Sequence, residues 1–401
     1  MTEKLYDINA YDTEFTANVL SCEKCEDGRY AVVLDRTLFF PEEGGQTPDR
    51  GTLGGAEVLD VQISKDGTIT HYLNNEVSDE VSGSIDFFHR FSNMQNHTGE
   101  HIFSGLVHSR FGYDNVGFHL SDNTVTMDYN GAFTDEDIRE LEREANEVIF
   151  KNLPIRAWYP SEEELKSLDY RSKLDLTENV RIVEIEGVDL CACCAPHVKG
   201  TAEVGMLKVL YYMPHRGGTR FTILCGRRAL FDYEEKQDTL LSISRGYSTS
   251  PDKLAEVLKK QQAELLDVKY ALEKKIREAL IREAKDLLQR IDKGDNIEKN
   301  IFSDVFDKKS LIIFSDDATE SAARDTVNVM KEKTDEYIAI FMRQEDKGED
   351  EGDVASGGKK KYRYVIGSKE KDAREIQKLL KERFDAKGGG KPEMIQGTVE
   401  A

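Results

Sequence analysis

Short apolar segments alternate with turn-forming residues over the first ninety positions of the chain. Tyr30–Leu34 is an apolar run, and Glu57–Ile63 alternates roughly between polar and apolar side chains, as a strand with one buried face does. Asp-Gly and Gly-Gly pairs separate these segments and favour tight turns. The pairs are Asp27-Gly28, Gly54-Gly55 and Asp66-Gly67. The pattern predicts a small β-barrel over residues 1–90.

The hydrophobic period becomes helical in the next part of the chain. From Asn93 to Phe111, apolar residues form a stripe with the spacing of an α-helix. A second helical pattern runs from Asp135 to Asn152 and stops before Pro154. Residues 155–225 then mix strand-like segments with a cysteine-rich motif. This order predicts an α+β domain over residues 91–245.

Residues 251–292 predict a long, charged helical segment with an apolar stripe. The apolar residues recur at steps of three, four and seven, which is typical of a coiled coil. They are Leu254, Leu258, Leu265, Val268, Leu272, Ile276, Leu280, Leu287 and Ile291. One long helix and a helical hairpin both fit this pattern, and Gly294 interrupts it.

The final segment, residues 295–401, alternates between strand-like and helix-like patterns. The strand-like runs are 311–314, 337–341 and 362–366, and the helical patterns between them are 318–333 and 371–384. This alternation predicts an α/β domain. The whole chain is therefore expected to be an α+β protein with a barrel, an α+β domain, a helical or coiled-coil linker and a C-terminal α/β domain.

Composition narrows the class of protein. A chain of 401 residues is expected to hold two or three domains, and it has no apolar run of about eighteen residues that would predict a transmembrane helix. The N-terminus lacks the apolar core of a signal peptide. Three of the six cysteines crowd beside one His, which fits metal binding in a reducing compartment better than a disulfide framework. We therefore expect a cytoplasmic protein.

The net charge of −21 argues against a generally adhesive nucleic-acid-binding protein. A local exception lies between Lys359 and Lys391. This segment contains twelve Lys and Arg residues and only five Asp and Glu residues. Taken alone, such a run is most simply a solvated helix face. Contact with phosphates becomes attractive only where other features point to nucleic acid.

Two short motifs carry the candidate chemistry. His97 and His101 are four positions apart, so a helix would project both imidazoles from one face. Cys193 and His197 have the same separation in a turn that contains a proline. Three imidazoles and one thiolate suit zinc better than an oxygen-preferring ion. Cys191 and Cys194 remain alternatives to Cys193, and the spacing does not distinguish a structural from a catalytic zinc.

Three further features have both a functional and a simpler structural reading. Glu100 lies within the His motif, but Thr98 occupies the position of the metalloprotease glutamate, so a general-base role ranks below a supporting or surface one. The loop 39–51 contains Gly44, Gly45, Gln46 and Thr47, which could approach and hydrogen-bond a small substrate, or simply form a barrel turn.

A basic loop is the third of these features. Arg216 and Arg220 flank a glycine pair, and they could contact phosphate or belong to a turn between strands.

Cys22 and Cys25 have the spacing of a metal knuckle, but no second pair follows at zinc-finger spacing.

Together these motifs resemble the editing domain of alanyl-tRNA synthetase and its freestanding relatives, the AlaX-type alanyl-tRNA editing proteins. The similar segments occur in the family's order along the chain. They are Phe40–Gln46 for the Gly-Gly-Gln loop, His97–His101, Cys193–His197, Leu224–Ala229 and the glycine-rich tail 388–397, which resembles the end of a DHHA1 domain. The family's usual Cys-Gly-Gly-Thr-His is Cys-Cys-Ala-Pro-His here, which keeps the ligands and alters the loop between them.

The resemblance implies a function and a site. It implies a hydrolase that removes serine and glycine from mischarged tRNA(Ala), with one zinc per chain held by His97, His101, Cys193 and His197. Gln46 and the Gly44-Gly45 backbone would position the aminoacyl-adenosine end, and Thr47 would read the serine hydroxyl. The synthetase's aminoacylation half would precede this region, whereas the chain begins at the predicted barrel, so we expect an ester hydrolase and not a ligase.

The resemblance also implies partners. Lys359, Lys360, Lys361 and Lys391, with Arg216 and Arg220, would contact the tRNA backbone. The C-terminal domain over 295–401 would bind tRNA or mediate dimerisation, and the helical linker would join in a homodimer. Two rival interpretations remain at this point: a Ser-tRNA(Thr) deacylase of the same fold, and a non-catalytic tRNA-binding protein with a closed structural zinc.

Overall fold

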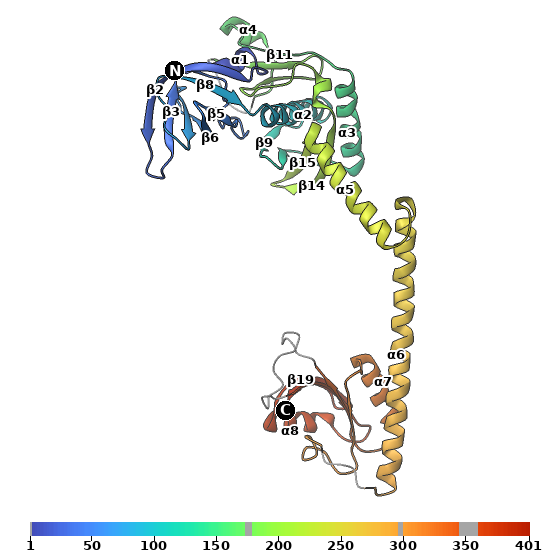
Figure 1. The fold of residues 1–401 in the computed structure, drawn as a ribbon. Helices are drawn as coiled ribbons and strands as arrows, with labels where there is room; N and C mark the ends of the chain where they lie inside the picture. Colours follow the sequence, from blue (N-terminus) through green and yellow to red (C-terminus); the bar gives the residue numbers. More distant parts are fainter. Residues whose placement is uncertain (1, 173–178, 296–299, 345–359) are drawn as a thin grey trace. The chain divides into compact units, whose positions relative to one another are not determined.

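The computed structural model of the protein describes residues 2–172, 179–295, 300–344 and 360–401. Lys359, one of the predicted tRNA-contacting residues, therefore lies outside the described residues. The chain divides into two compact units, residues 1–242 and residues 243–401. Figure 1 shows the helices and strands of each unit. No helix of the described part combines the length and the apolar character needed to cross a membrane.

A closed six-stranded barrel forms the first part of the N-terminal unit (Figure 1, blue). Its strands pair antiparallel in the order β2-β3-β7-β6-β5-β8. They are β2 (Glu14–Lys24), β3 (Tyr30–Leu34), β5 (Gly51–Leu53), β6 (Ala56–Ile63), β7 (Ile69–Leu73) and β8 (Glu80–Ile85). Two-residue strands β1 (Glu3–Lys4) and β4 (Arg36–Thr37) pair beside a short helix, α1 (Leu5–Ile8). The predicted N-terminal barrel is confirmed.

Helix α2 (Phe87–Phe111) follows the barrel and runs through the rest of the unit. It begins after Asp86, whose side chain accepts a hydrogen bond from the backbone N–H of His89. It ends at Gly112, which adopts a left-handed φ of 66°. The helix therefore starts six residues earlier than Asn93, where the apolar stripe predicted its start, because its first turns bury polar side chains.

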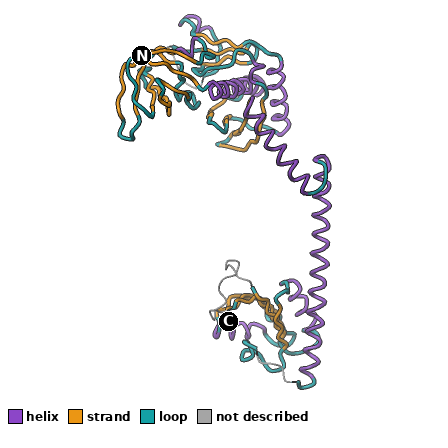
Figure 2. The backbone as a smooth tube through the Cα atoms, viewed as in Figure 1, coloured by secondary structure: helices purple, strands orange, loops and turns teal. Residues whose placement is uncertain are grey.

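Two sheets and further helices surround α2 (Figure 2). One antiparallel sheet has the order β14-β15-β10-β9, and the other has the order β11-β12-β13. Their strands are β9 (Asn115–Leu120), β10 (Val125–Tyr129), β11 (Ile155–Trp158), β12 (Ile182–Ile185), β13 (Asp189–Ala192), β14 (Leu207–His215) and β15 (Gly218–Cys225). The helices are α3 (Asp135–Phe150), α4 (Glu162–Ser167) and α5 (Gly226–Gly246). Phe103 of α2 packs against Phe221 of β15 in the apolar core of this part.

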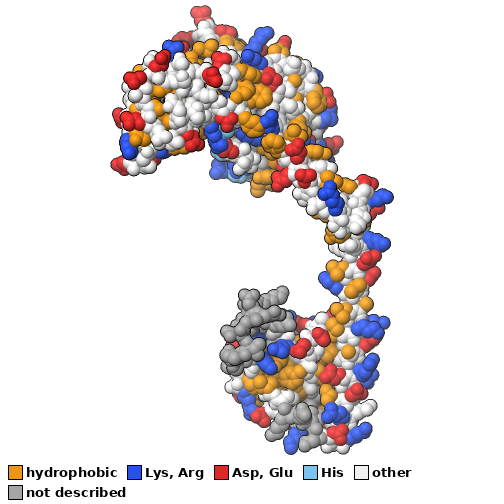
Figure 3. Space-filling view, viewed as in Figure 1, with side chains coloured by type: hydrophobic (Ala, Val, Ile, Leu, Met, Phe, Trp, Pro, Cys, Tyr) orange, Lys and Arg blue, Asp and Glu red, His pale blue; other side chains and the backbone are white. Residues whose placement is uncertain are grey.

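The C-terminal unit contains one long helix, α6 (Leu254–Asp292), of 39 residues. The helical-hairpin alternative is therefore wrong. Along α6 only Leu254, Leu280 and Ala284 are buried, and apolar side chains lie exposed among charged ones (Figure 3). The exposed ones are Leu258, Leu265, Leu266, Val268, Tyr270 and Leu272. Whether this stripe forms a coiled coil stays a prediction.

A five-stranded sheet of order β16-β17-β18-β20-β19 completes the C-terminal unit. Its first pair is parallel and the other pairs are antiparallel. The strands are β16 (Leu311–Ser315), β17 (Ile338–Arg343), β18 (Lys361–Gly367), β19 (Asp385–Lys391) and β20 (Met394–Glu400). One face packs on α6 and α7 (Glu320–Met330), and the other on α8 (Ala373–Arg383). The predicted α+β class is confirmed, whereas the boundaries of the four proposed domains stay a prediction.

Candidate metal centre

Helix α2 carries two of the four predicted metal ligands, His97 and His101. Neighbouring segments of the chain pack closely against this helix. His97, Glu100 and His101 lie on one face, because positions three and four apart project together. Gly99 and Gly105 make room for neighbouring segments. A Cβ on Gly99 would lie 2.2 Å from Cys225 Sγ, and one on Gly105 would lie 2.4 Å from the carbonyl oxygen of Val188. These contacts bring β15 and the start of β13 against the helix.

The second motif follows directly from β13, and Arg181 holds it in place. Arg181 is buried, and its Nη1 donates hydrogen bonds to the carbonyl oxygens of Cys193, at 3.1 Å, and Ala195, at 2.8 Å. The Cys193 backbone N–H in turn donates to the carbonyl of Arg181, at 3.0 Å. The Cys193–His197 turn is thus fixed at its start by one buried guanidinium.

The fold brings the four predicted ligands together. One ligand atom from each of His97, His101, Cys193 and His197 lies within 4.8 Å of the other three. Cys193 Sγ is 3.5 Å from His97 Nε2 and 3.3 Å from His197 Nε2. The three imidazoles are buried, while Cys193 is partly exposed. Three imidazole nitrogens and one sulfur form a donor set that could hold a transition-metal ion.

Each imidazole is oriented by a hydrogen bond at Nδ1. His97 Nδ1 donates to Gln46 Oε1, at 2.8 Å, and His101 Nδ1 donates to Asp189 Oδ2, at 2.9 Å. His197 Nδ1 lies 3.0 Å from Thr98 Oγ1. With Nδ1 occupied in this way, each ring presents the lone pair of Nε2 to the cluster when it is in its neutral form, as a metal ligand must.

Electrostatics favour the thiolate form of Cys193. Burial opposes ionisation of this thiol, but the three imidazoles outweigh it and hold its pKa well below the ordinary cysteine value. Burial lowers the pKa of His197 to about 3, which keeps that ring neutral. Burial also opposes the charged form of His101, yet Cys193 and Asp189 raise its pKa well above the usual value. A thiolate is the form of Cys193 that could bind a metal ion at this cluster.

The two neighbouring cysteines lie in different surroundings. Cys194 packs against the barrel core and is hydrogen-bonded to Glu43, and burial raises its pKa. Cys191 is buried near Asp189, and burial raises its pKa to about 11. Of the three, Cys193 is the one whose sulfur groups with the three imidazoles, while Cys191 groups with His101 and Asp189.

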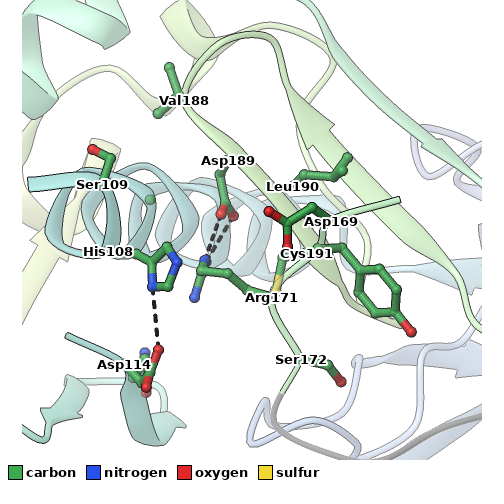
Figure 4. A pocket seen from close by; sticks show the side chains of 13 residues that line it. His108, Ser109, Asp114, Asp169, Arg171, Ser172, Val188, Asp189, Leu190 and Cys191 are labelled. Atoms are coloured by element: carbon green, nitrogen blue, oxygen red, sulfur yellow. Dashed lines mark hydrogen bonds and ion pairs between the residues drawn. The ribbon is translucent and has the colours of Figure 1, made fainter. Parts of the chain in front are cut away.

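A cavity of about 420 Å³ adjoins the supporting residues of the site (Figure 4). Arg171 crosses it to form two hydrogen bonds to Asp189, at 2.7 Å and 2.9 Å, and His108 pairs with Asp114, at 3.3 Å. Asp189 therefore links the cavity wall to His101. The cavity volume falls in the range of small-ligand sites.

The chain is similar to known proteins over this part of its length. A family model described as "Threonyl and Alanyl tRNA synthetase second additional domain" matches residues 180–237, which include Cys193 and His197. The alanyl-tRNA editing protein AlaX-M of Methanosarcina mazei is 37% identical over 231 residues, covering 52% of this chain and 90% of that protein. The chain belongs to the alanyl-tRNA editing protein family. Its AlaX-type assignment from the motifs is confirmed.

Longer relatives match a smaller share of their own length. AlaX-L of Pyrococcus horikoshii is 35% identical over 246 residues, 59% of this chain and 61% of that protein. An alanine–tRNA ligase of Ignicoccus hospitalis is 31% identical over 284 residues, 67% of this chain and 31% of the ligase. The chain thus spans less than two thirds of these two relatives.

The glycine loop of this family member lies next to the cluster. Gly44 and Gly45 are exposed, with left-handed φ values of 63° and 83° that favour glycine. Gly45 accepts a hydrogen bond from the Leu120 N–H, at 2.7 Å, and Thr47 donates one to the Leu120 carbonyl, at 3.2 Å. Gln46 is fully buried against His97. Its side chain therefore orients the predicted metal ligand His97 and does not lie open to solvent.

The predicted tRNA-contacting residues are spread over both units. Arg216 is exposed, with a left-handed φ of 47°, in the turn between β14 and β15. Arg220 makes two hydrogen bonds to Asp128, each 2.6 Å long. Lys360 is exposed, Lys361 pairs with Glu400 at 3.3 Å, and Lys391 is the last residue of β19.

Gln46 and Thr98, which contact His97 and His197, lie within segments that the sequence already singles out. The other supporting residues, Asp189, Arg171 and Arg181, belong to no recognisable motif. One signal was available, because Asp189 precedes Cys191 by two positions and side chains two apart on a strand share a face. For Arg171, ten positions upstream of Arg181, no sequence pattern indicates that its partner would be Asp189.

Proposed function

We propose that this protein is a zinc-dependent trans-editing hydrolase that deacylates Ser-tRNA(Ala) and Gly-tRNA(Ala). The observation that carries the proposal is the grouping of His97, His101, Cys193 and His197, with one ligand atom of each within 4.8 Å of the other three. The reaction is hydrolysis of the ester between the amino acid and the terminal ribose. The names of the AlaX relatives support alanyl-tRNA editing as the activity.

Zinc is the metal that the donor set favours, with one ion per chain. Nitrogen and thiolate donors suit zinc, and four protein ligands complete a tetrahedron unless the ion expands its coordination. When bound, zinc would act as a Lewis acid that polarises the ester carbonyl or a water. The open side of a catalytic zinc would lie toward the exposed Gly44 and Gly45, because Gly44 is next to Cys194 of the same motif.

The glycine loop would receive the aminoacyl end of the substrate. The exposed Gly44 and Gly45 allow a close backbone approach, and Gln46 keeps His97 in its ligating orientation. Thr47 Oγ1 is buried and has no hydrogen-bond partner within the described residues. Such an oxygen would bind the serine hydroxyl and would lose that bond when alanine enters, which penalises the correct substrate.

The basic residues would bind the tRNA backbone. Arg216, Lys360 and Lys391 offer charges for phosphates, with Lys359, Lys361 and Arg220 as further members of the proposed set. The apolar stripe of α6 would pair with the same stripe of a second copy, because a heptad pattern is complementary to itself. Translation quality control in the cytoplasm is the setting that these assignments imply.

The test is a deacylation assay with the purified protein on Ser-tRNA(Ala), Gly-tRNA(Ala), Ala-tRNA(Ala) and Ser-tRNA(Thr). We expect Ser-tRNA(Ala) to be hydrolysed at least about 100-fold faster than Ala-tRNA(Ala), and Gly-tRNA(Ala) to be hydrolysed as well. A chelator should abolish the reaction, and zinc should restore it. Metal-independent hydrolysis, or preference for Ser-tRNA(Thr), would overturn the proposal.

A further inference from the structure

Arg228, in the first turn of α5, is partly buried and forms no ion pair within the described residues. Its side chain donates three hydrogen bonds, to Ser92 Oγ at 2.8 Å, to the Ser121 carbonyl at 2.6 Å and to Asn93 Oδ1 at 2.6 Å. All three acceptors are neutral oxygens. Burial lowers the pKa of Arg228, which means that the surroundings disfavour its charge. A charge in such a place is costly until an anion pairs with it.

The guanidinium of Arg228 keeps donors for a ligand. An arginine side chain has five N–H groups, and the three hydrogen bonds use three of them. The other two have no acceptor in the described part of the chain. Arginine binds phosphate strongly, because its planar group can donate two parallel hydrogen bonds to two phosphate oxygens. The bonds to Ser92, Asn93 and Ser121 hold this group in place before a ligand binds.

Two further arginines belong to the same region, and we call the three together the arginine cluster. Arg50 is exposed, its charge acts on Arg228, and it pairs with Asp122. Arg227 is also exposed, and its guanidinium lies over the ring of Phe88, 4.2 Å from the ring centre. It has no ion-pair partner among the residues that the structure describes. The cluster therefore combines three cations with one carboxylate, and such a local excess of positive charge attracts anions.

Two other acids of this region are held by the fold. Asp49 forms a fully buried ion pair with Arg90. Asp86 accepts a hydrogen bond from the backbone N–H of His89 at the start of α2, at 3.1 Å. Neither acid pairs with Arg228, so the charge of that arginine is left for a ligand.

The arginine cluster adjoins the glycine loop. Arg50 is the last residue of that loop before β5. Ser121, whose carbonyl accepts a hydrogen bond from Arg228, directly follows Leu120. The backbone N–H of Leu120 donates to the carbonyl of Gly45, at 2.7 Å. A ligand that ends at the glycine loop can therefore extend onto the arginine cluster.

We propose that Arg50, Arg227 and Arg228 bind the last phosphodiester of the RNA substrate, the one that joins the terminal adenosine to the nucleotide before it. This inference rests on the proposed function, in which the aminoacyl end of that adenosine lies at the glycine loop. The ester and this phosphodiester are attached to the same ribose. The phosphodiester is an anion with two free oxygens, which matches a partly buried guanidinium without a counter-ion. The cluster would thus distinguish RNA-linked aminoacyl esters from free aminoacyl nucleosides.

A purely structural role for Arg228 makes a different prediction. Its hydrogen bonds join α5 to α2 and to the turn after β9, so their loss would also loosen this part of the fold. A loosened fold lowers the rates for all substrates alike. Loss of a phosphate contact lowers only the rates for substrates that carry the phosphate. The ratio of the rates for two substrates therefore separates the two roles.

The experiment measures kcat/KM for 3′-O-seryl-adenosine with a free 5′-hydroxyl and for the same ester carrying a 5′ methyl phosphodiester. We expect wild type to prefer the phosphodiester about 10 to 100-fold, because hydrogen bonds to a charged group contribute about that factor. Arg228→Gln should lower this preference about 10-fold or more. Arg50→Gln, at an exposed position where folding is least affected, should lower it about twofold to fivefold.

Arg227→Gln and Arg29→Gln are a matched pair. Arg29 lies on the barrel, pairs with Asp27 and sits over the ring of Tyr72, 4.6 Å from the ring centre. Both substitutions therefore remove a guanidinium from an aromatic ring. Arg227→Gln should lower the preference for the phosphodiester about twofold to fivefold, whereas Arg29→Gln should leave it unchanged.

A binding measurement keeps the test independent of turnover. The same two compounds with an amide in place of the ester are not hydrolysed, and titration calorimetry gives their affinities for wild type and for Arg228→Gln. If wild type hydrolyses neither ester, the proposed function fails, and the affinities still test the arginine cluster. A wild-type protein that does not distinguish the two amides, or an Arg228→Gln protein that distinguishes them as wild type does, would overturn this inference alone.

Discussion

Helices α2 and α6 have opposite relations between side-chain chemistry and burial. Seventeen of the 25 residues of α2 are buried, and many of them are polar or charged. In the 39-residue α6, three residues are buried, and several large apolar side chains are exposed. The buried polar residues of α2 and the exposed apolar residues of α6 both run against the tendency of apolar residues to be inside and polar ones outside.

Each of these two arrangements carries a cost in free energy, and a different kind of contact offsets that cost. A buried polar group is costly unless it is hydrogen-bonded, and the polar residues of α2 that surround the cluster have partners: Gln46 for His97, Asp189 for His101 and Ser104 for Glu100. An exposed apolar stripe is costly in water unless a partner covers it. The first arrangement groups potential metal ligands within one chain, and the second is the basis of the proposed self-association through α6.

The largest expected effect is on the metal site beside α2. Cys193→Ala should lose the metal, because it removes the only thiolate of the four-ligand set. Cys194→Ala and Cys191→Ala are matched controls from the same motif and should retain about one zinc per chain. Metal analysis of the three purified variants measures this. Zinc retained by Cys193→Ala would break the ligand assignment.

Metal removal should change the stability of α2 and leave that of α6 unchanged. A ligand that binds only the folded state, at about 1,000 times its Kd, adds about 4 kcal/mol to the free energy of unfolding. Chelation should therefore lower the hydrogen-exchange protection of amides in α2, whereas amides in the part of α6 packed on its own sheet should be unchanged. Equal loss of protection in both helices would show that the metal does not act locally.

The sequence predicted α6 and the ligands of α2 for different physical reasons. The heptad steps of Leu258, Leu265 and Leu272 define a helix whether or not anything covers them, because the period alone is diagnostic. His97 and His101 were found because a four-residue spacing places two ligands on one helix face. Both signals are local in the chain, and local signals can be read from one sequence.

What could not be predicted depends on contacts between distant residues. Asp189 reaches His101 because Gly105 lets the chain at Val188 approach α2. The spacing of Asp189 and Cys191 places both on one strand face, but no local pattern identifies His101 as the partner of Asp189. The strand β19 was also missed, since three consecutive glycines argue against a strand. A Cβ on Gly388 would lie 2.6 Å from the Tyr364 hydroxyl, so glycine is needed there by a neighbour two strands away.

A third prediction concerns the apolar stripe of α6. Leu265→Glu should weaken self-association by about 3 kcal/mol, because burying one Leu contributes about 1.5–3 kcal/mol and a charge cannot replace it at an apolar seam. Ala263→Glu is the matched control, since Ala263 is exposed but lies outside the stripe. Sedimentation equilibrium measures the dissociation constant. A wild-type protein that stays monomeric would remove assembly as the explanation for the exposed leucines.

The smallest expected effect tests the support that α2 receives from β13. Asp189→Asn keeps an oxygen for the hydrogen bond from His101 Nδ1 but removes the carboxylate charge that Arg171 and His101 share. Changes to such supporting groups lower metal affinity about 10 to 100-fold. Competition titration with a chelating dye measures that affinity. Asp114→Asn, which removes a carboxylate from the opposite wall of the same cavity, should leave it unchanged. If both variants lowered the metal affinity equally, the loss would reflect the net charge of the cavity. The hydrogen bond between Asp189 and His101 would then not be the reason that His101 of α2 is held as a ligand.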